Sequence, residues 1–77
     1  MTQLQLYAGA QVFTATDRPG PRRMTRACYV WAHNKAEAVG LMIADAQKNF
    51  SEGHYCDHNA VAIAVDGVTK TAEEVGQ

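Results

Sequence analysis

Apolar and polar residues alternate near the start of the chain. Between Leu4 and Thr16 most even positions are apolar, whereas Gln5 and Gln11 occupy odd positions. A period of two is typical of a strand with one buried face, so we predict a first strand here with its even side toward the core. Gly9, in the middle of this strand, indicates either a bulge or a close approach of the helix backbone.

A proline-containing turn separates this strand from a second one. Positions 17–22 read Asp-Arg-Pro-Gly-Pro-Arg, which excludes ladder pairing and helix and predicts a stiff hairpin loop. The second strand is predicted from about Arg23 to His33. One of its faces carries Met24, Cys28, Val30 and Ala32, and the other carries Thr25, Tyr29, Trp31 and His33. Both faces of this strand therefore carry apolar side chains.

The periodicity becomes helical after position 34. Asn34 is a favourable N-cap, and Glu37, three residues later, is placed to accept a hydrogen bond from the Asn34 amide. From Lys35 to about Phe50 the apolar residues form one stripe, which predicts a helix that packs on the sheet by one face. Gly40 costs this helix about 1 kcal/mol relative to alanine, which the rest of the pattern outweighs.

A polar segment over residues 53–59 precedes the third alternating stretch. We predict a strand over residues 60–65 with Val61, Ile63 and Val65 toward the core, ended by a turn at 66–67. Residues 71–74 resemble a helix start, although a frayed tail fits the end of the chain equally well. We expect a single domain over residues 1–77, with an ordered core at about 4–66 and a tail at 67–77.

The order strand, strand, helix, strand restricts the topology. A tight hairpin makes the first two strands antiparallel, and a right-handed crossover through the helix places the third strand beside the first. We therefore predict an α+β fold (β-β-α-β) with a three-stranded antiparallel or mixed sheet in the order 2-1-3. One helix packs on one face of this sheet, and the other face is left open.

The open side of this sheet is predicted to be rich in aromatic residues. With the even side of the first strand under the helix, the opposite face presents Tyr7, Phe13, Tyr29 and Trp31. Soluble monomers seldom expose such a patch, and tyrosine and tryptophan are enriched at binding hot spots. These four residues are therefore a candidate partner-binding or dimer face. Two alternatives are that loops or the tail cover them, or that the register differs by one residue and they belong to the core.

Arginines concentrate at the hairpin loop. Arg18, Arg22, Arg23 and Arg26 are four of the seven basic residues, and guanidinium groups suit both phosphates and carboxylates. Beside an aromatic sheet they suggest a small nucleic-acid-binding module as the alternative function. The nearly neutral charge balance and the lack of a ribonucleoprotein motif favour an acidic protein patch as the ligand, and a solvated loop is the plainest reading.

The size and charge of the chain limit the kinds of function that it can have. Seven basic and eight acidic residues exclude binding driven by global charge. A chain of 77 residues buries a small core, so reinforcement by a homodimer or another partner is expected. The N-terminus lacks a signal-peptide pattern, and no apolar run approaches about 20 residues. We expect a cytoplasmic protein without a membrane segment, in which Cys28 and Cys56 are free thiols.

No group of residues has the spacing of a catalytic or metal site. His54, Cys56 and His58 share one face of an extended segment but span about 13 Å, too far for one zinc ion. A Cys-His nucleophile would lack an oxyanion loop and an acid partner. We therefore expect no cofactor, no metal and no enzymatic activity. A metal-stabilised structural protein, which a chelator would destabilise, is a third class.

A resemblance to known proteins is carried by the second strand and the start of the helix. This stretch reads Val30-x-Ala32-x-Asn34-Lys35-Ala36-Glu37-Ala38. With the chain's size and its single helix on a small sheet, it resembles small proteins encoded by bacteriophages and mobile elements, among them the anti-CRISPR inhibitors. The likeness covers about residues 4–65, and this group has no shared functional motif from which a residue role could be transferred.

The resemblance implies a compact, non-enzymatic protein that binds a subunit of a bacterial defence (CRISPR-Cas) complex and blocks it by occluding its surface. The present chain departs from the strongly acidic members that imitate DNA, because its charges nearly balance. We therefore expect a protein-binding inhibitor that uses arginine and aromatic contacts, with nucleic acid as the alternative ligand.

Overall fold

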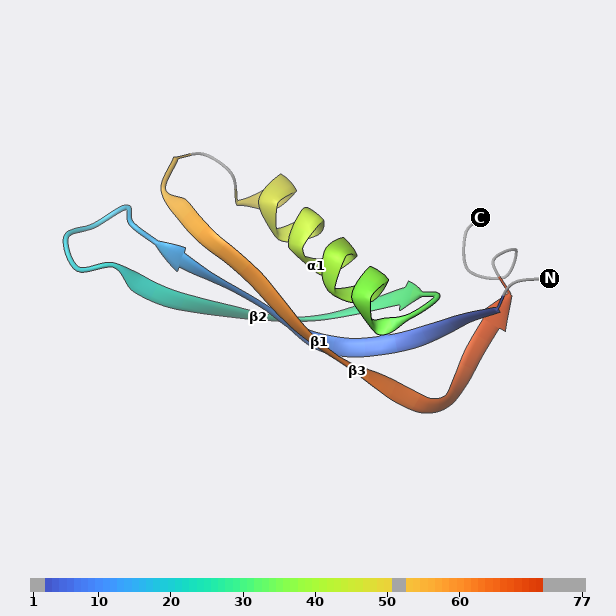
Figure 1. Cartoon of the computed structure of the whole chain (residues 1–77). Coiled ribbons are helices and arrows are strands. Elements are labelled where there is room, and N and C mark those ends of the chain that lie inside the picture. Colours follow the sequence, from blue (N-terminus) through green and yellow to red (C-terminus); the bar gives the residue numbers. More distant parts are fainter. Residues whose placement is uncertain (1–2, 51–52, 72–77) are drawn as a thin grey trace.

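The computed structural model describes residues 3–50 and 53–71, with the backbone alone at residues 70 and 71 (Figure 1). The elements follow the order β1 (Gln3–Ala15), β2 (Arg22–Ala32), α1 (Lys35–Asn49) and β3 (Tyr55–Thr71). Both strand pairings are antiparallel, and the sheet order is β2-β1-β3. The predicted α+β class, element order and sheet order are therefore confirmed.

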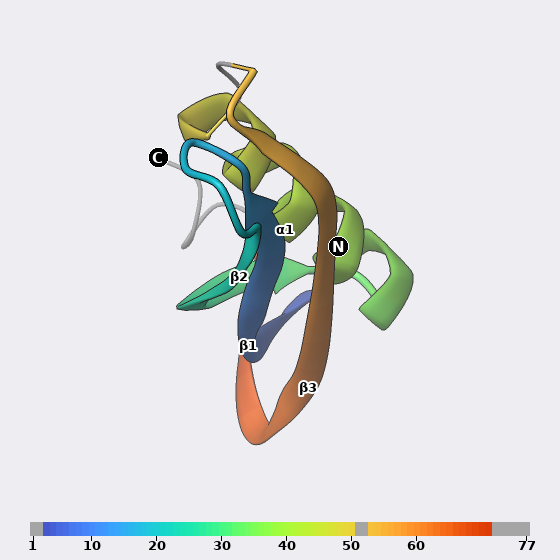
Figure 2. The same cartoon turned by 90° about the vertical axis from the view of Figure 1, so that its left-hand side faces the viewer.

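The hairpin of β1 and β2 is regular. Its register runs without a break from the pair Gln5–Ala32 to the pair Ala15–Arg22. The predicted proline-containing loop closes it, and Gly20 in this loop has a φ of 85°. β1 is therefore the central strand, and β2 forms one edge of the sheet, as the end-on view shows (Figure 2).

β3 is longer than the sequence predicted. It spans Tyr55–Thr71 instead of 60–65, so it includes part of the predicted polar segment and residues 67–71 of the predicted tail. Its pairing with β1 shifts twice, once between Val12 and Thr14 and once between Gln5 and Tyr7. The predicted helix start at 71–74 lies mostly outside the described residues.

The first shift is a bulge at Asp57. Between the pairs Val12–Asn59 and Thr14–Cys56, β3 has one more residue than β1. Asp57 adopts a φ of 55°, a left-handed conformation that Asp tolerates better than most residues. A bulge reverses the alternation of side chains along the strand, so the residues before it face the other way from what a regular strand would require.

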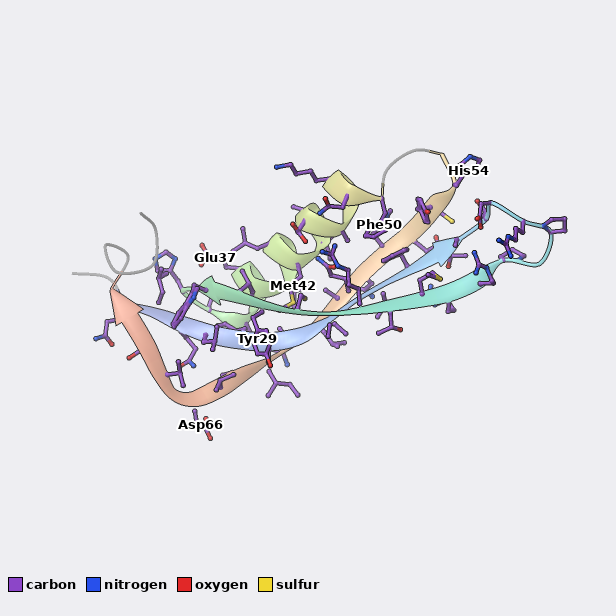
Figure 3. The ribbon with its side chains drawn as sticks, turned by 180° about the vertical axis from the view of Figure 1, so that it is seen from behind. Tyr29, Glu37, Met42, Phe50, His54 and Asp66 are labelled. Atoms are coloured by element: carbon purple, nitrogen blue, oxygen red, sulfur yellow. The ribbon has the colours of Figure 1, made fainter. Side chains whose placement is uncertain are left out.

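The second shift is a sharp bend that the side chain of Gln5 fills. Gln5 Nε2 lies 2.6 Å from the Val65 carbonyl oxygen and 3.2 Å from that of Val68. Gly67, with a φ of 75°, allows the turn. The predicted turn at residues 66–67 is therefore a bend inside β3 rather than its end, and Asp66 lies at the outside of this bend (Figure 3).

The N-cap of α1 is confirmed. The Asn34 side-chain oxygen accepts a hydrogen bond from the Glu37 amide at 2.8 Å. The Glu37 carboxylate reaches one residue further back than predicted, because it accepts a hydrogen bond from the His33 backbone amide and lies 2.8 Å from His33 Nδ1. At the other end, the Phe50 amide donates to the Ala46 carbonyl, and the helix stops at Asn49.

The contact at Glu37 is expected to make stability depend on acid pH. The hydrogen bond from the His33 amide and the neighbouring His33 ring hold the pKa of this carboxyl below its ordinary value. Such a group stabilises the fold above its unfolded-state pKa, and this contribution is lost as the pH falls through its folded-state pKa. We expect the melting temperature of the wild type to drop more steeply than that of Glu37→Gln below about pH 4.3. Parallel melting curves across this range would contradict the prediction.

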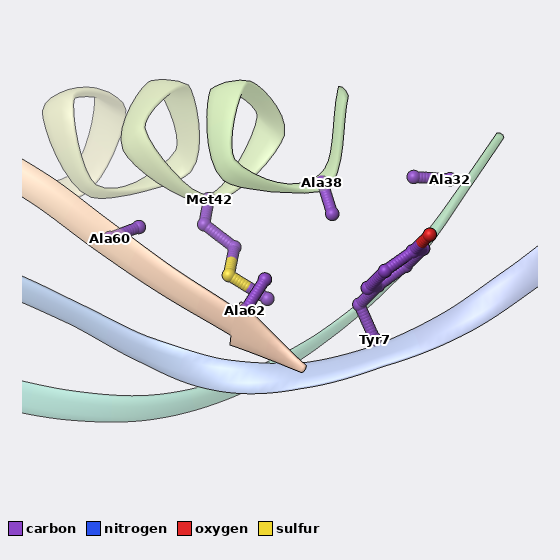
Figure 4. Packing of buried hydrophobic residues seen from close by; sticks show 6 residues of the cluster. All are labelled: Tyr7, Ala32, Ala38, Met42, Ala60 and Ala62. Carbon is purple, nitrogen blue, oxygen red and sulfur yellow. The ribbon is translucent and has the colours of Figure 1, made fainter. Parts of the chain in front are cut away.

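The core lies between α1 and one face of the sheet. Its buried cluster comprises Tyr7, Ala32, Ala38, Met42, Ala60 and Ala62 (Figure 4). The odd positions of β1 face the helix, so the predicted side of this strand is wrong. The predicted side of β3 is also wrong, because Ala60 and Ala62 are buried and Val61 and Ile63 are exposed.

Burial of the aromatic rings explains this choice of face. Both sides of β1 are apolar, since the even side has Leu4, Leu6 and Val12 besides its alanines, but Tyr7 and Phe13 are the largest side chains of the strand. An aromatic side chain buries about 150–250 Å², and each Å² contributes about 25 cal/mol. Strand pairing then determines which side of β3 faces the helix. Ala62 lies opposite Gly9 and Ala60 opposite Gln11, so both alanines are on the helix side.

Gln11 is the polar residue that this arrangement buries. Its side chain is 1% exposed, and Nε2 donates to the Met42 carbonyl at 2.9 Å and to the Asp45 carboxylate at 2.8 Å. These bonds satisfy the amide nitrogen and attach the middle of α1 to the central strand. The side-chain oxygen Oε1 is buried without a hydrogen-bond partner among the described residues, so the cost of burying this glutamine is offset in part.

Candidate functional site

The sheet has a second face that no described residue covers, here called the open face. Paired residues on neighbouring strands share a face, and successive residues alternate, so the register assigns each side chain to one side. The open face carries Leu6, Ala8, Ala10 and Val12 from β1, Ala27, Tyr29 and Trp31 from β2, and Val61 and Ile63 from β3. These nine residues form one apolar surface opposite α1.

Side chains of different size occupy the centre and the edges of the open face. Ala8 lies between Tyr29 and Ile63, and Ala10 lies between Ala27 and Val61, so small side chains occupy the central strand. The large residues on the edges are well exposed: Tyr29 is 72%, Val61 is 60% and Ile63 is 73% accessible. Tyr29 projects from the side of the sheet away from α1 (Figure 3).

The predicted aromatic patch is divided between the two faces. Tyr29 and Trp31 lie on the open face as predicted, and Trp31 is half-buried there. Tyr7 and Phe13 were predicted on this face, but they lie beneath the helix with 7% and 2% exposure. The alternative that the aromatic residues belong to the core is therefore right for the two on β1. Val61 and Ile63 lie on the open face instead. The alternation along β3 placed these two residues on one side of the strand, but that side was predicted to face the core.

Phe13 is the centre of an aromatic cluster that closes one end of the core. Its ring stacks on Phe50 with centroids 4.8 Å apart and on His58 at 5.6 Å, and it meets the edge of Tyr55 at 5.7 Å. His58 Nε2 lies 3.0 Å from the Phe50 carbonyl oxygen. The bulge at Asp57 turns Tyr55 to this side of the sheet, whereas His58 follows the regular alternation from Ala60, and the sequence pattern did not reveal the bulge.

The four candidate arginines do not form one cluster. Arg22 and Arg26 lie on the helix side of β2, Arg23 lies on the opposite side, and Arg18 is in the loop. Arg22 is paired with Asp17 at 3.0 Å, and its hydrogen bond lowers the pKa of that carboxyl. Arg23 donates to the Thr14 hydroxyl at 3.0 Å.

Arg26 is also engaged within the molecule. Its guanidinium lies over the Phe50 ring, 5.6 Å from the centroid, and 3.9 Å from the Asp45 carboxylate. Two of the three arginines of β2 are therefore already paired with acidic or aromatic side chains. The sequence placed these residues together along the chain, and the strand separates them in space because neighbouring side chains point to opposite faces.

A groove of about 300 Å³ lies between α1 and β2. It is lined by Gln11, Cys28, Tyr29, Val30, Leu41, Met42 and Asp45. The helix packs mainly over β3, so the helix side of β2 is only partly covered (Figure 2). The groove is therefore a consequence of the offset of the helix, and it borders the free edge of the sheet.

The two cysteines are free thiols with raised pKa values. Burial raises the pKa of Cys28, and the nearby Asp45 carboxylate raises it further. Cys56 is exposed, and desolvation and the neighbouring Asp57 carboxylate raise its pKa. A raised pKa keeps a thiol protonated near neutral pH and makes it a poor nucleophile. Among the described residues no three histidine, cysteine or acidic side chains come together as a metal site.

Comparisons of the chain with known protein families, curated proteins and solved structures found no match. The part of the chain that is described also contains no helix with the length and apolar character needed to cross a membrane. The open face is therefore the feature of the molecule from which a function can be inferred.

Proposed function

We propose that this chain acts by binding another protein through the open face. The observation that carries the proposal is the exposure of Tyr29, Val61 and Ile63, between 60% and 73%, on one uncharged surface. Contiguous apolar patches of this kind on small soluble domains mark interaction sites. Tyrosine is enriched at hot spots because it buries a large area at a small cost in conformational entropy.

A protein ligand fits the open face better than nucleic acid does. Phosphate binding requires several unpaired basic groups, because affinity comes largely from the counterions that they release. The open face has no charged residue between its Leu6 and Val12 rows, and Arg22 and Arg26 are already engaged. An exposed apolar surface with Tyr29, Val61 and Ile63 instead matches the apolar centre of a protein interface.

We also propose that binding is the whole of its activity. The raised pKa values of Cys28 and Cys56 support a non-enzymatic role, because they disfavour the thiolate that covalent catalysis needs. His58, a candidate base, is held against the Phe50 carbonyl and the Phe13 ring. These groups stabilise the fold and are poorly placed for chemistry on a substrate.

The class of partner that we propose is a subunit of a bacterial defence complex of the CRISPR-Cas type. This part of the proposal rests on the resemblance of residues 30–38 to phage-encoded anti-CRISPR inhibitors. The open face is the surface through which such an inhibitor binds. An inhibitor of this kind works stoichiometrically, by covering a site that nucleic acid or a nuclease must reach. Charge mimicry is disfavoured because basic and acidic residues nearly balance.

The test compares binding by the wild type with a double variant of the open face, Tyr29→Ser with Ile63→Ser. Purified CRISPR surveillance complexes of several types are immobilised, and the affinity for the added chain and the cleavage of target DNA are measured. We expect the double variant to bind at least about 30-fold more weakly, the loss typical of hot-spot residues, and to release the inhibition. Both residues are more than 70% exposed, so the fold is retained.

Leu41→Ser is the matched control for this experiment. Leu41 is also an exposed apolar residue, at 44%, but it lies on α1 away from the open face. We expect it to bind like the wild type. Equal affinity of the double variant and the wild type would contradict the use of the open face. Steep loss of affinity for free DNA or RNA with added salt would favour the nucleic-acid alternative.

A further inference from the structure

The two edges of the sheet differ in a way that bears on self-association. The edge strand β3 is interrupted twice, by the bulge at Asp57 and by the bend at Asp66 and Gly67. Bulges and charged residues are devices by which edge strands resist pairing with other chains. β2 has neither interruption: all 11 of its residues are described, they pair regularly with β1, and none is a proline or has a positive φ. The backbone of the β3 edge is therefore interrupted and that of the β2 edge is continuous, so the three arginines of β2 are the one protective feature that the β2 edge retains.

We propose that the free edge of β2 pairs with the same edge of a second copy of this chain. The two strands run antiparallel about a two-fold axis at Ala27, and the three strands of each copy join into one six-stranded sheet. This association uses the edge of the sheet, so it goes beyond the proposed function, which uses the open face.

The length of β2 selects the register. Antiparallel neighbours share a face, so a continuous sheet with both helices on one side requires each residue to oppose one of the same parity. β2 runs from Arg22 to Ala32, and its 11 residues all find a partner only when Ala27 opposes Ala27. The register with the most backbone hydrogen bonds is therefore centred on a small residue.

The arginines of β2 are compatible with this register. Arg22 then opposes Ala32 of the second copy, Arg23 opposes Trp31, and Arg26 opposes Cys28. No arginine faces another, and Arg23 lies beside an aromatic ring, which is a favourable neighbour for a guanidinium. The register displaced by one step toward the N-terminus places Arg26 opposite Arg26, and like charges in that position are destabilising.

The chain is more extended than a compact domain of its length, so more of its surface is available to partners. Its radius of gyration is 14.2 Å, whereas a compact domain of 77 residues has about 11.5 Å. Its accessible surface is 5107 Å², against about 4,600 Å² for a monomer of 8.4 kDa. The groove between α1 and β2 borders the pairing edge, so a second copy covers Cys28 and Val30 from the side. The open faces of the two copies then form one continuous surface.

Cysteine cross-linking tests the register directly. In the full chain with Cys28→Ser and Cys56→Ser, Ala27→Cys places two thiols across the axis. Opposed residues in antiparallel strands have Cα atoms about 4.5–5.5 Å apart, which is within the range of a disulfide. Thr25→Cys in the same background is the control, because its two copies are about 13 Å apart. We expect mild oxidation to give a disulfide-linked dimer with Ala27→Cys and not with Thr25→Cys.

Analytical ultracentrifugation of the purified chain gives the second readout. We expect the wild type to be a dimer and Ala27→Glu to be a monomer, because two carboxylates then meet at the axis, whereas Thr25→Glu stays dimeric. A monomeric wild type at high micromolar concentration overturns the proposal, and so does faster cross-linking at position 25 than at position 27. A dimer that survives Ala27→Glu but is lost with Ile63→Ser also overturns it, since the copies would then pack through their open faces.

Discussion

Replacement of Phe13 by alanine is expected to lower the free energy of unfolding by about 3–5 kcal/mol, the usual loss for a buried phenylalanine. Phe13 is 2% exposed and contacts Phe50, Tyr55 and His58, so its removal leaves a cavity lined by the end of α1 and by β3. A domain of 77 residues has a total stability of about 4–12 kcal/mol. The variant therefore loses a quarter or more of its stability, which urea unfolding measures.

Tyr29→Ala is the matched control, because Tyr29 is an aromatic residue of the neighbouring strand that is 72% exposed. We expect it to change the free energy of unfolding by less than about 0.5 kcal/mol, as surface substitutions usually do. Phe13→Leu keeps apolar volume and loses the ring contacts, so its stability is expected between those of the wild type and Phe13→Ala. Equal stability of Phe13→Ala and Tyr29→Ala would show that Phe13 is not part of the core.

Gly9→Ala is expected to destabilise the protein by about 1–3 kcal/mol or more, as overpacking in a closely packed region does. A Cβ atom at Gly9 would lie 1.9 Å from the Val61 carbonyl oxygen and 3.1 Å from the Ala62 Cα atom. Both are backbone atoms of β3, so no side chain can rotate away and the two strands must separate. The sequence predicted a close approach here, but the approaching backbone belongs to β3 and not to the helix.

For Gly40→Ala, which is the same glycine-to-alanine change at another position, we expect a gain in stability instead of a loss. Gly40 lies in α1, and a Cβ atom there would meet nothing within 4 Å. We expect this variant to be more stable by about 1 kcal/mol, because alanine favours the helix over the unfolded chain. Thermal unfolding of both variants tests the pair. Destabilisation by Gly40→Ala, or a neutral Gly9→Ala, would contradict the packing described here.

The outline of the fold could be predicted because its signals are local. The prolines between β1 and β2, the Asn34 cap and the stripe of apolar residues in α1 each act over a few residues. The limits of β3 could not be predicted, because its pairing continues through Asp57 and the bend at Gly67. Both are irregularities that only the neighbouring strand β1 stabilises.

The candidate site was predicted in part. Tyr29 and Trp31 are on the open face because their strand alternates clearly, with Val30 and Ala32 on the helix side. Val61 and Ile63 were missed because an alternating apolar strand has no local mark that distinguishes the covered side from the open side. Their assignment depends on which face of β1 the helix covers.

By itself, the sequence determined the elements, their order and the neighbours of β1, since turns, caps and periodicity arise from interactions between residues close along the chain. Only the tertiary structure decided which faces of β1 and β3 are buried. Both sides of β1 are apolar, and the choice depends on the larger area that Tyr7 and Phe13 bury and on the hydrogen bonds from Gln11 to α1. These contacts join residues about 30 positions apart, so no local pattern in the chain specifies them.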